Sequence, residues 1–220
     1  MNALREECQQ LRDELIALRR EFHRAPELGL HEYHTAARIE RELDRCGIPH
    51  ERVGETAVVG HLTGNGNGSG LVVLRADIDA LPIQETNDVP YRSQTPGMMH
   101  ACGHDAHTTC LLGAAKVLSA HLADFGGEVR FLFQPAEEIF QGSPDMLANG
   151  LLEDPHVDAA VMFHVLAGMP LPAGMVLVPG GGITMASCEQ YHIVVRGKGG
   201  HGSTPENCID PITAAAHIHI

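Results

Sequence analysis

The sequence predicts an α/β protein with a mostly parallel sheet flanked by helices, followed by the start of a smaller second domain. First, continuous apolar segments of strand length alternate with helical periodicity, which is typical of a parallel sheet covered on both faces. Second, side chains of catalytic and metal-binding types follow those apolar segments, where sites in such sheets gather. Third, 220 residues with 44% hydrophobic and 20% charged content are enough to bury a core.

The N-terminal part is predicted to contain two helices and two strands. Apolar residues within 4–22 alternate steps of four and three, which predicts an amphipathic helix that packs on a sheet or, alternatively, on another helix. A second helix is expected over 32–46, before a glycine and a proline. Strands are expected at 56–62 and 71–76, with a flexible glycine-rich hairpin turn at 63–70 between them.

The following segment continues the alternation. A buried helix is expected from Asp105 to about His121, a strand over 128–133, a short helix over 143–148 and an apolar strand from 158 to 165. After Ser187 the character changes, and a glycine-rich turn leads into a helix near Asp210 that lacks any stop signal. Since 187–220 is shorter than the roughly 50 residues of a domain, we expect the chain to be cut short.

Composition and charge exclude several functions. The formal charge of −13 argues against nucleic acid or an anionic membrane as the main partner. No apolar run reaches the roughly 18 residues of a membrane span, and the charged N-terminus does not resemble a secretory signal. The six cysteines show no paired spacing, which favours a cytoplasmic protein with mostly free thiols.

The segment Met99–His107 concentrates metal-ligand chemistry. Cys102 and His104 lie two residues apart just before a helix, whose N-terminus is expected to lower the pKa of the thiol and favour a thiolate ligand. The alternative is a buried free cysteine and a helix-capping histidine. His107 lies one helical turn further, and its position favours a structural role over direct ligation.

Carboxylates and one histidine follow three of the predicted strands. Glu137 and Glu138 point in different directions, so that one can coordinate a metal ion while the other serves as a general base; a solvated surface pair is the alternative. Asp77 and Asp79 share one side of a strand end, where they suit bridging ions, orienting a ligand histidine or capping a turn. His164 closes an apolar strand, where a buried core histidine is the alternative.

Six segments in a fixed order span nearly the whole chain. They are His23–Leu28, Arg75–Ile83, Met99–His107, Phe133–Glu138, His164–Val165 and Gly199–Pro205. Together they resemble the metal-dependent aminoacylase/carboxypeptidase superfamily, and within it the amidohydrolase branch with hippurate hydrolase, N-acyl-amino-acid amidohydrolases and plant auxin-conjugate hydrolases. The resemblance implies hydrolysis of the amide bond of a small-molecule N-acyl amino acid by a metal-activated water.

The resemblance also implies roles for individual residues. Two divalent metal ions, Zn²⁺ or Mn²⁺, would be held by Cys102, His104, Glu138 and His164, with Glu137 as general base, Asp79 orienting the site and His201 stabilising the oxyanion. Residues 1–186 would form an incomplete catalytic metal-binding domain, and 187–220 the beginning of an α+β lid domain, through which a homodimer is possible.

Two other classes of function remain open at this point. Family members are about twice as long and supply a further histidine ligand after the lid, so the alternative is an inactive, truncated remnant with some metal binding. The other class is a hydrolase that uses Cys102 as nucleophile with His104 or His107 as base.

Overall fold

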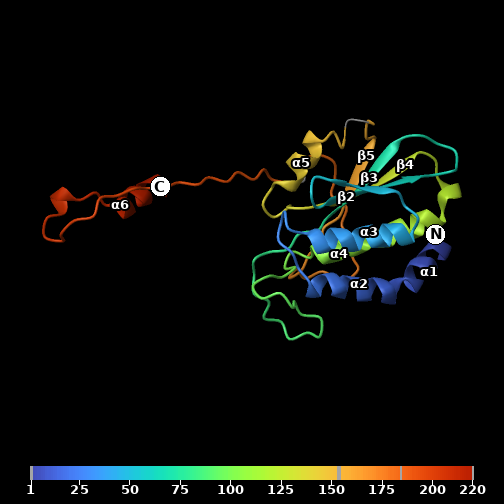
Figure 1. The fold of residues 1–220 in the computed structure, drawn as a ribbon, viewed down its shortest axis with the longest axis horizontal. Helices are drawn as coiled ribbons and strands as arrows, with labels where there is room; N and C mark the ends of the chain where they lie inside the picture. Colours follow the sequence, from blue (N-terminus) through green and yellow to red (C-terminus); the bar gives the residue numbers. More distant parts are fainter. Residues whose placement is uncertain (1, 153–154, 184, 220) are drawn as a thin grey trace. The chain divides into compact units, whose positions relative to one another are not determined.

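The computed structural model describes residues 2–152, 155–183 and 185–219, in two compact units, Met1–Met169 and Pro170–Ile220 (Figure 1). The second unit contains a short 3₁₀ turn at Pro205–Asn207, the helix α6 (Pro211–His219) and an isolated bridge between Lys198 and Ile209. The helix predicted near Asp210 is therefore confirmed. The predicted domain boundary at 186/187 falls within this second unit and stays a prediction.

A mixed sheet forms the centre of the first unit. Within the described residues it has five strands in the order β1-β2-β4-β3-β5. The strands are β1 (His50–Val53), β2 (Ala57–Thr63), β3 (Leu71–Asp77), β4 (Glu128–Gln134) and β5 (Ala159–Met162). The pairs β3–β4 and β3–β5 are parallel, whereas β1–β2 and β2–β4 are antiparallel. The α/β class is confirmed, but the parallel pairing is confined to one half of the sheet.

The glycine-rich turn at 63–70 does not join a hairpin, so that prediction is wrong. Strand β4 lies between β2 and β3, with Phe133 opposite Val58 on one side and Ala76 on the other. The hairpin of this sheet joins β1, which the sequence analysis missed, to β2. Turn residues identify where the chain reverses, but they do not specify which strand it pairs with.

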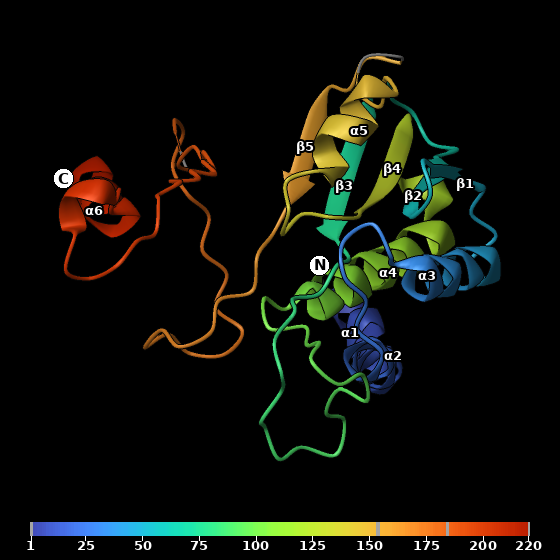
Figure 2. The ribbon, with the colours of Figure 1, turned by 60° about the vertical axis from the view of Figure 1, so that its left-hand side comes forward.

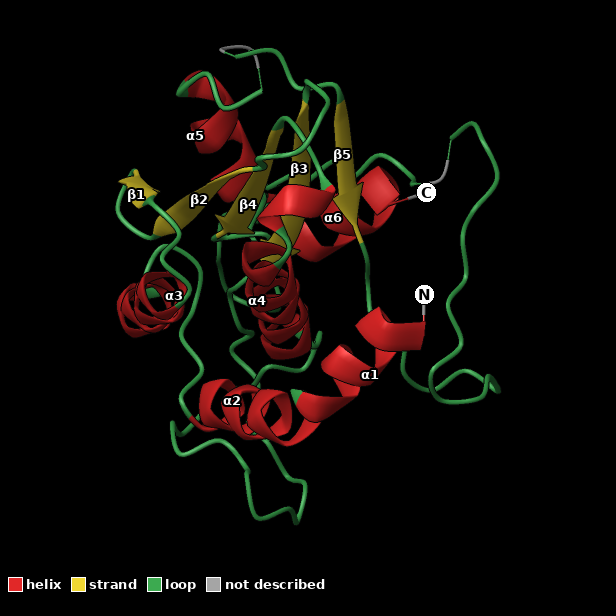
Figure 3. Cartoon of the chain, turned by 90° about the vertical axis from the view of Figure 1, so that its right-hand side faces the viewer, coloured by secondary structure: helices red, strands yellow, loops and turns green. Residues whose placement is uncertain are grey.

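Four helices lie on one side of this sheet, two directly against it and two packed behind them, and one short helix covers the other face (Figures 2 and 3). The first group is α1 (Asn2–Gln10), α2 (Arg12–Arg24), α3 (Tyr33–Arg45) and α4 (His104–Ala120), and the opposite face carries α5 (Gly142–Ala148). The single helix predicted over 4–22 is interrupted at Leu11, which separates α1 from α2. Within the described residues, no helix has the length and apolar character needed to cross a membrane.

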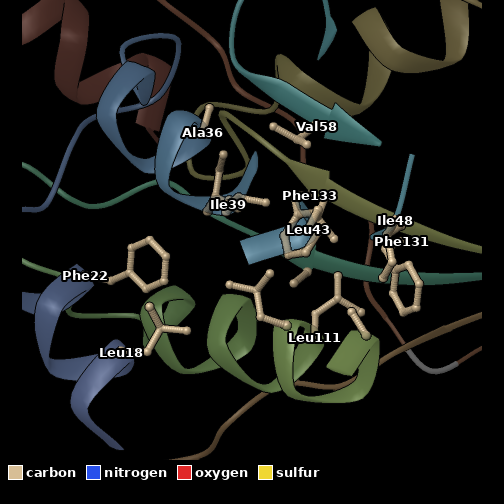
Figure 4. Packing of buried hydrophobic residues seen from close by; sticks show 14 of the residues in the cluster. Leu18, Phe22, Ala36, Ile39, Leu43, Ile48, Val58, Leu111, Phe131 and Phe133 are labelled. Carbon is tan, nitrogen blue, oxygen red and sulfur yellow. The ribbon is translucent and has the colours of Figure 1, made fainter. Parts of the chain in front are cut away.

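The main core lies between α2, α3, α4 and the sheet (Figure 4). Phe131 and Phe133 lie two positions apart on β4, so both rings point to the same face of the sheet. They are buried there in one cluster with Leu43 of α3 and Leu111 of α4. A smaller apolar cluster packs Met146 of α5 against the opposite face. Burial on both faces fixes the register of β3 and β4 and places their carboxyl ends side by side, next to the first turn of α4.

Candidate metal centre

Six of the seven predicted site residues meet at the carboxyl ends of β3, β4 and β5. Potential ligand atoms lie within 4.8 Å of one another in three groups that all contain His104. The groups are Cys102 with His104 and His164, His104 with Glu137 and Glu138, and Asp77 with His104 and His107. Asp79 contacts both His104 and the backbone of Glu138. Residues as far apart in the sequence as Asp77 and His164 therefore form one cluster.

His104 stands at the centre because the chain turns sharply just before it. Gly103 has a φ of +95°, a conformation that side chains disfavour, and a Cβ there would lie 2.5 Å from Val165. His104 is the first residue of α4 and is fully buried. Its Nδ1 donates to the backbone oxygen of Asp79 at 3.0 Å, with the Asp79 carboxylate at 3.2 Å. This contact leaves the Nε2 lone pair to face the carboxylates.

The two glutamates are presented by a turn after β4. Ala136 has a φ of +50°, and its backbone N–H donates to the buried carboxylate of Glu32 at 2.8 Å. The next peptide units are turned so that the backbone N–H of Glu138 donates to Asp79 Oδ2 at 3.0 Å. A carboxylate oxygen of Glu137 and one of Glu138 each lie 3.8 Å from His104 Nε2.

Two buried atoms in the cluster lack hydrogen-bond partners. They are His104 Nε2 and Glu138 Oε1, which face each other at 3.8 Å. A buried polar atom without a partner is costly, and here an imidazole lone pair and a carboxylate oxygen converge on one point. Divalent cations take such donors, so the side chains present fit a metal ion.

Cys102 and His164 form the other side of the cluster. Cys102 Sγ lies 3.3 Å from His164 Nε2, and His164 Nδ1 donates to the backbone oxygen of Val165 at 2.6 Å. Burial first, and then the nearby carboxylates led by Glu138, raise the pKa of Cys102 to about 12. The expected lowering of this pKa by the helix N-terminus is therefore wrong, because burial and then the negative charges around the thiol outweigh the dipole.

The electrostatics of the cluster favour a cation. Burial raises the pKa of Asp77, but the hydrogen bond with His107 and the nearby His104 and Arg75 outweigh it and hold that pKa at about 2. The pKa of Glu138 is raised, first by burial and then by the neighbouring Glu137. A bound divalent ion relieves carboxylate crowding and stabilises a thiolate.

Several residues that hold this cluster had no firm role predicted from the sequence. Asp77 was noted beside Asp79, but its partners Arg75 and His107, at 2.8 and 2.5 Å, were not foreseen. Along β3, the alternation Arg75-Ala76-Asp77 puts the side chains of Arg75 and Asp77 on the same side of the strand. This alternation is the sequence signal for the contact between Arg75 and Asp77. Nothing local marked Glu32, whose partner Ala136 lies 104 residues away.

His201, the seventh predicted site residue, belongs to the second unit. Its Nδ1 accepts the backbone N–H of Ser203 at 3.2 Å, and the Ser203 hydroxyl oxygen lies 2.8 Å from the same nitrogen. An Nδ1 that accepts an N–H leaves the ring proton on Nε2, so a neutral His201 presents an Nε2–H donor.

A second buried network lies on the opposite side of α4's first turn. His23 contacts Asp105 through Nδ1 at 2.6 Å and Glu85 through Nε2 at 3.2 Å, and Arg19 Nε lies 2.9 Å from Asp105. The hydrogen bond with Asp105 raises the pKa of His23 above its ordinary value of 6.5, against the opposing effect of burial. His23 is buried and anchors the segment after β3 to α2.

We expect His23 to make stability depend on pH. The folded state holds the imidazole proton more tightly than the unfolded state does. The stabilisation is therefore complete below 6.5 and is lost as pH rises through the raised folded-state pKa. His23→Gln should cost more free energy of unfolding at about pH 6 than at about pH 9 by urea titration. His34→Gln, at an exposed position of α3, is the control, and an equal cost of His23→Gln at both pH values would contradict the assignment.

Comparison with known proteins gives a consistent result. The family model for peptidase family M20/M25/M40 matches residues 73–217. The N-acetylcysteine deacetylase of Bacillus subtilis is 42% identical over 206 residues, 93% of this chain and 53% of that protein. The hippurate hydrolase of Campylobacter jejuni is 42% identical over 207 residues, 94% of this chain and 52% of that protein.

Among solved structures, a dinuclear metal binding peptidase of the M20 family from Bacillus subtilis superposes with a TM-score of 0.65 and 41% identity. The match covers 69% of this chain and 42% of that one. The chain thus spans about half the length of the curated relatives it matches.

Proposed function

Because the chain belongs to the M20/M25/M40 peptidase family, as the six sequence segments indicated, we propose that it contributes the metal centre of an amidohydrolase acting on N-acyl amino acids. The observation that carries the proposal is the unpartnered pair of buried atoms, His104 Nε2 and Glu138 Oε1, inside a cluster of cysteine, histidine and carboxylate. Relatives named as an N-acetylcysteine deacetylase and a hippurate hydrolase support the substrate class.

Four residues are proposed as the metal ligands: Cys102, His104, Glu138 and His164. Their side chains meet in overlapping groups, and the description of one solved relative as a dinuclear metal binding peptidase supports two ions. Bound divalent ions, Zn²⁺ or Mn²⁺, would polarise the scissile carbonyl and make a water molecule more acidic. Asp79 keeps the His104 ring fixed through Nδ1 and holds the backbone of Glu138, so that both side chains converge.

Glu137 is proposed as the general base. Its carboxylate lies beside His104 Nε2 but, with 33% of its side chain exposed, it remains open to water and substrate. There it can take a proton from the attacking water and deliver it to the leaving amine. His201 is proposed to donate its Nε2–H to the developing oxyanion, a role consistent with the acceptance of the Ser203 N–H by Nδ1.

A cysteine-nucleophile mechanism has less support. It requires a thiolate at Cys102, whereas burial and the surrounding carboxylates raise the pKa of this thiol to about 12. A homodimer through the second unit and a cytoplasmic location are further proposals. The six cysteines, all within the described residues, are free, as a cytoplasmic protein would have them.

The function is tested by incubating the protein with N-acetylcysteine, hippurate and other N-acyl amino acids and measuring the released amino acid. We expect hydrolysis that a chelator abolishes and that Zn²⁺ or Mn²⁺ restores. Chelator-resistant hydrolysis that is lost in Cys102→Ser would favour the nucleophilic mechanism instead. Metal binding without hydrolysis of any of these amides would favour the non-catalytic alternative.

A further inference from the structure

His164 lies on the most exposed segment of the proposed metal centre. All four residues of β5 are exposed, and the chain continues beyond them without regular secondary structure. His164 itself is exposed, whereas His104 is fully buried at the start of a long helix. An exposed side chain on such a segment needs an additional contact to hold a ligand geometry.

That contact comes from His107. The backbone N–H of Val165 donates to His107 Nε2 at 2.9 Å, so this nitrogen carries a lone pair and the ring proton must be on Nδ1. The Nδ1–H is in turn donated to Asp77 Oδ1 at 2.5 Å. Both ring nitrogens of His107 are therefore occupied by other protein groups, which leaves none for a metal ion.

Asp77 is itself fixed within the sheet. Its second carboxylate oxygen accepts a hydrogen bond from Arg75 at 2.8 Å, and its backbone oxygen accepts the hydroxyl of Thr108 at 3.1 Å. The contacts Arg75–Asp77–His107–Val165 thus run from β3 through α4 to the segment after β5. The rings of His107 and His164 also meet edge to face, with centroids 4.7 Å apart.

We propose that His107 is a positioning residue for His164, a proposal that rests on the proposed metal centre. By accepting the hydrogen bond from the Val165 N–H, His107 keeps His164, the residue before Val165, beside α4. The Val165 oxygen then takes the Nδ1 proton of His164 and leaves its Nε2 lone pair directed at Cys102. His107 acts through His164 and is assigned no contact with substrate or metal.

The test begins with the protein free of metal. In ¹⁵N-labelled protein, nuclear magnetic resonance is expected to find the His107 proton on Nδ1 and a slowly exchanging Val165 amide. A His107 proton on Nε2, or a Val165 amide that exchanges as fast as in an unprotected peptide, would overturn the proposal. This readout does not depend on metal binding or activity, so it separates the proposal from the proposed function.

Three variants then test positioning. His107→Phe keeps a ring but removes both hydrogen bonds, and we expect faster Val165 exchange and a 10–100-fold weaker affinity for Co²⁺. His107→Gln, which retains an acceptor at the end of its side chain, is expected to recover part of both effects. His121→Phe, at the other end of α4, is the matched control and should change neither. Lost Val165 protection with unchanged Co²⁺ affinity would overturn the positioning role.

Discussion

Glu137→Gln is expected to lower kcat for N-acyl amino acid hydrolysis by about 10²–10⁴-fold while leaving the affinity for divalent metal nearly unchanged. The variant keeps the size of the side chain but removes the carboxylate that accepts the water proton. Glu137 is more exposed than Glu138 and has no buried oxygen without a partner, which suits a group that moves protons rather than one that holds an ion.

The matched variant is Glu138→Gln, one position further along the same turn. Because one carboxylate oxygen of Glu138 is buried beside His104, this change should weaken metal affinity together with activity. Isothermal titration with Zn²⁺ and steady-state kinetics of the same preparations distinguish the two residues. Full activity in Glu137→Gln, or an equal loss of metal affinity in both variants, would show that the assigned roles are wrong.

His104→Asn is expected to remove the stabilisation that divalent metal gives to the fold. His104 belongs to all three candidate ligand groups, and its Nε2 is buried without a partner. An ion that binds only the folded state at a hundred times its Kd adds about 2.7 kcal/mol to the free energy of unfolding. Urea unfolding with and without Zn²⁺ should give this increment in the original protein and almost none in His104→Asn.

The control for this comparison is His61→Asn. His61 lies on β2, where it contacts Glu128 and Glu51 in a partly exposed position away from the cluster. Its substitution should leave the metal-dependent increment intact. An increment of the same size in His104→Asn would mean that the ion stabilises the protein from a different site.

Much of the fold was predictable because its signals are local. Continuous apolar segments placed β2, β3 and β4 to within a residue or two, and helical periodicity did the same for α3 and α4. The order of the strands was not predictable in this way. Whether β3 pairs with β2 or with β4 depends on packing between segments more than fifty residues apart, which no turn sequence encodes.

In the site, too, some features were predictable from local sequence and others were not. The residue types of Cys102, His104 and Glu138 indicated metal ligands, and the strand-end positions of Asp79, Glu138 and His164 indicated that these side chains would gather at one edge of the sheet. The sequence did not reveal how they are held. The raised pKa of Cys102 arises from burial and from carboxylates brought in from other strands, an effect opposite to the one expected from its neighbouring helix.

The central claim is that Cys102 and His104 bind the same divalent ion, and a Co²⁺ titration followed by absorption spectroscopy tests it most directly. A thiolate ligand gives a near-ultraviolet charge-transfer band, and binding should release the thiol proton despite the pKa of about 12 in the metal-free protein. We predict a saturable band that is absent in Cys102→Ser and strongly weakened in His104→Asn. Saturable Co²⁺ binding without this band, or a band that persists in Cys102→Ser, would contradict the proposed centre.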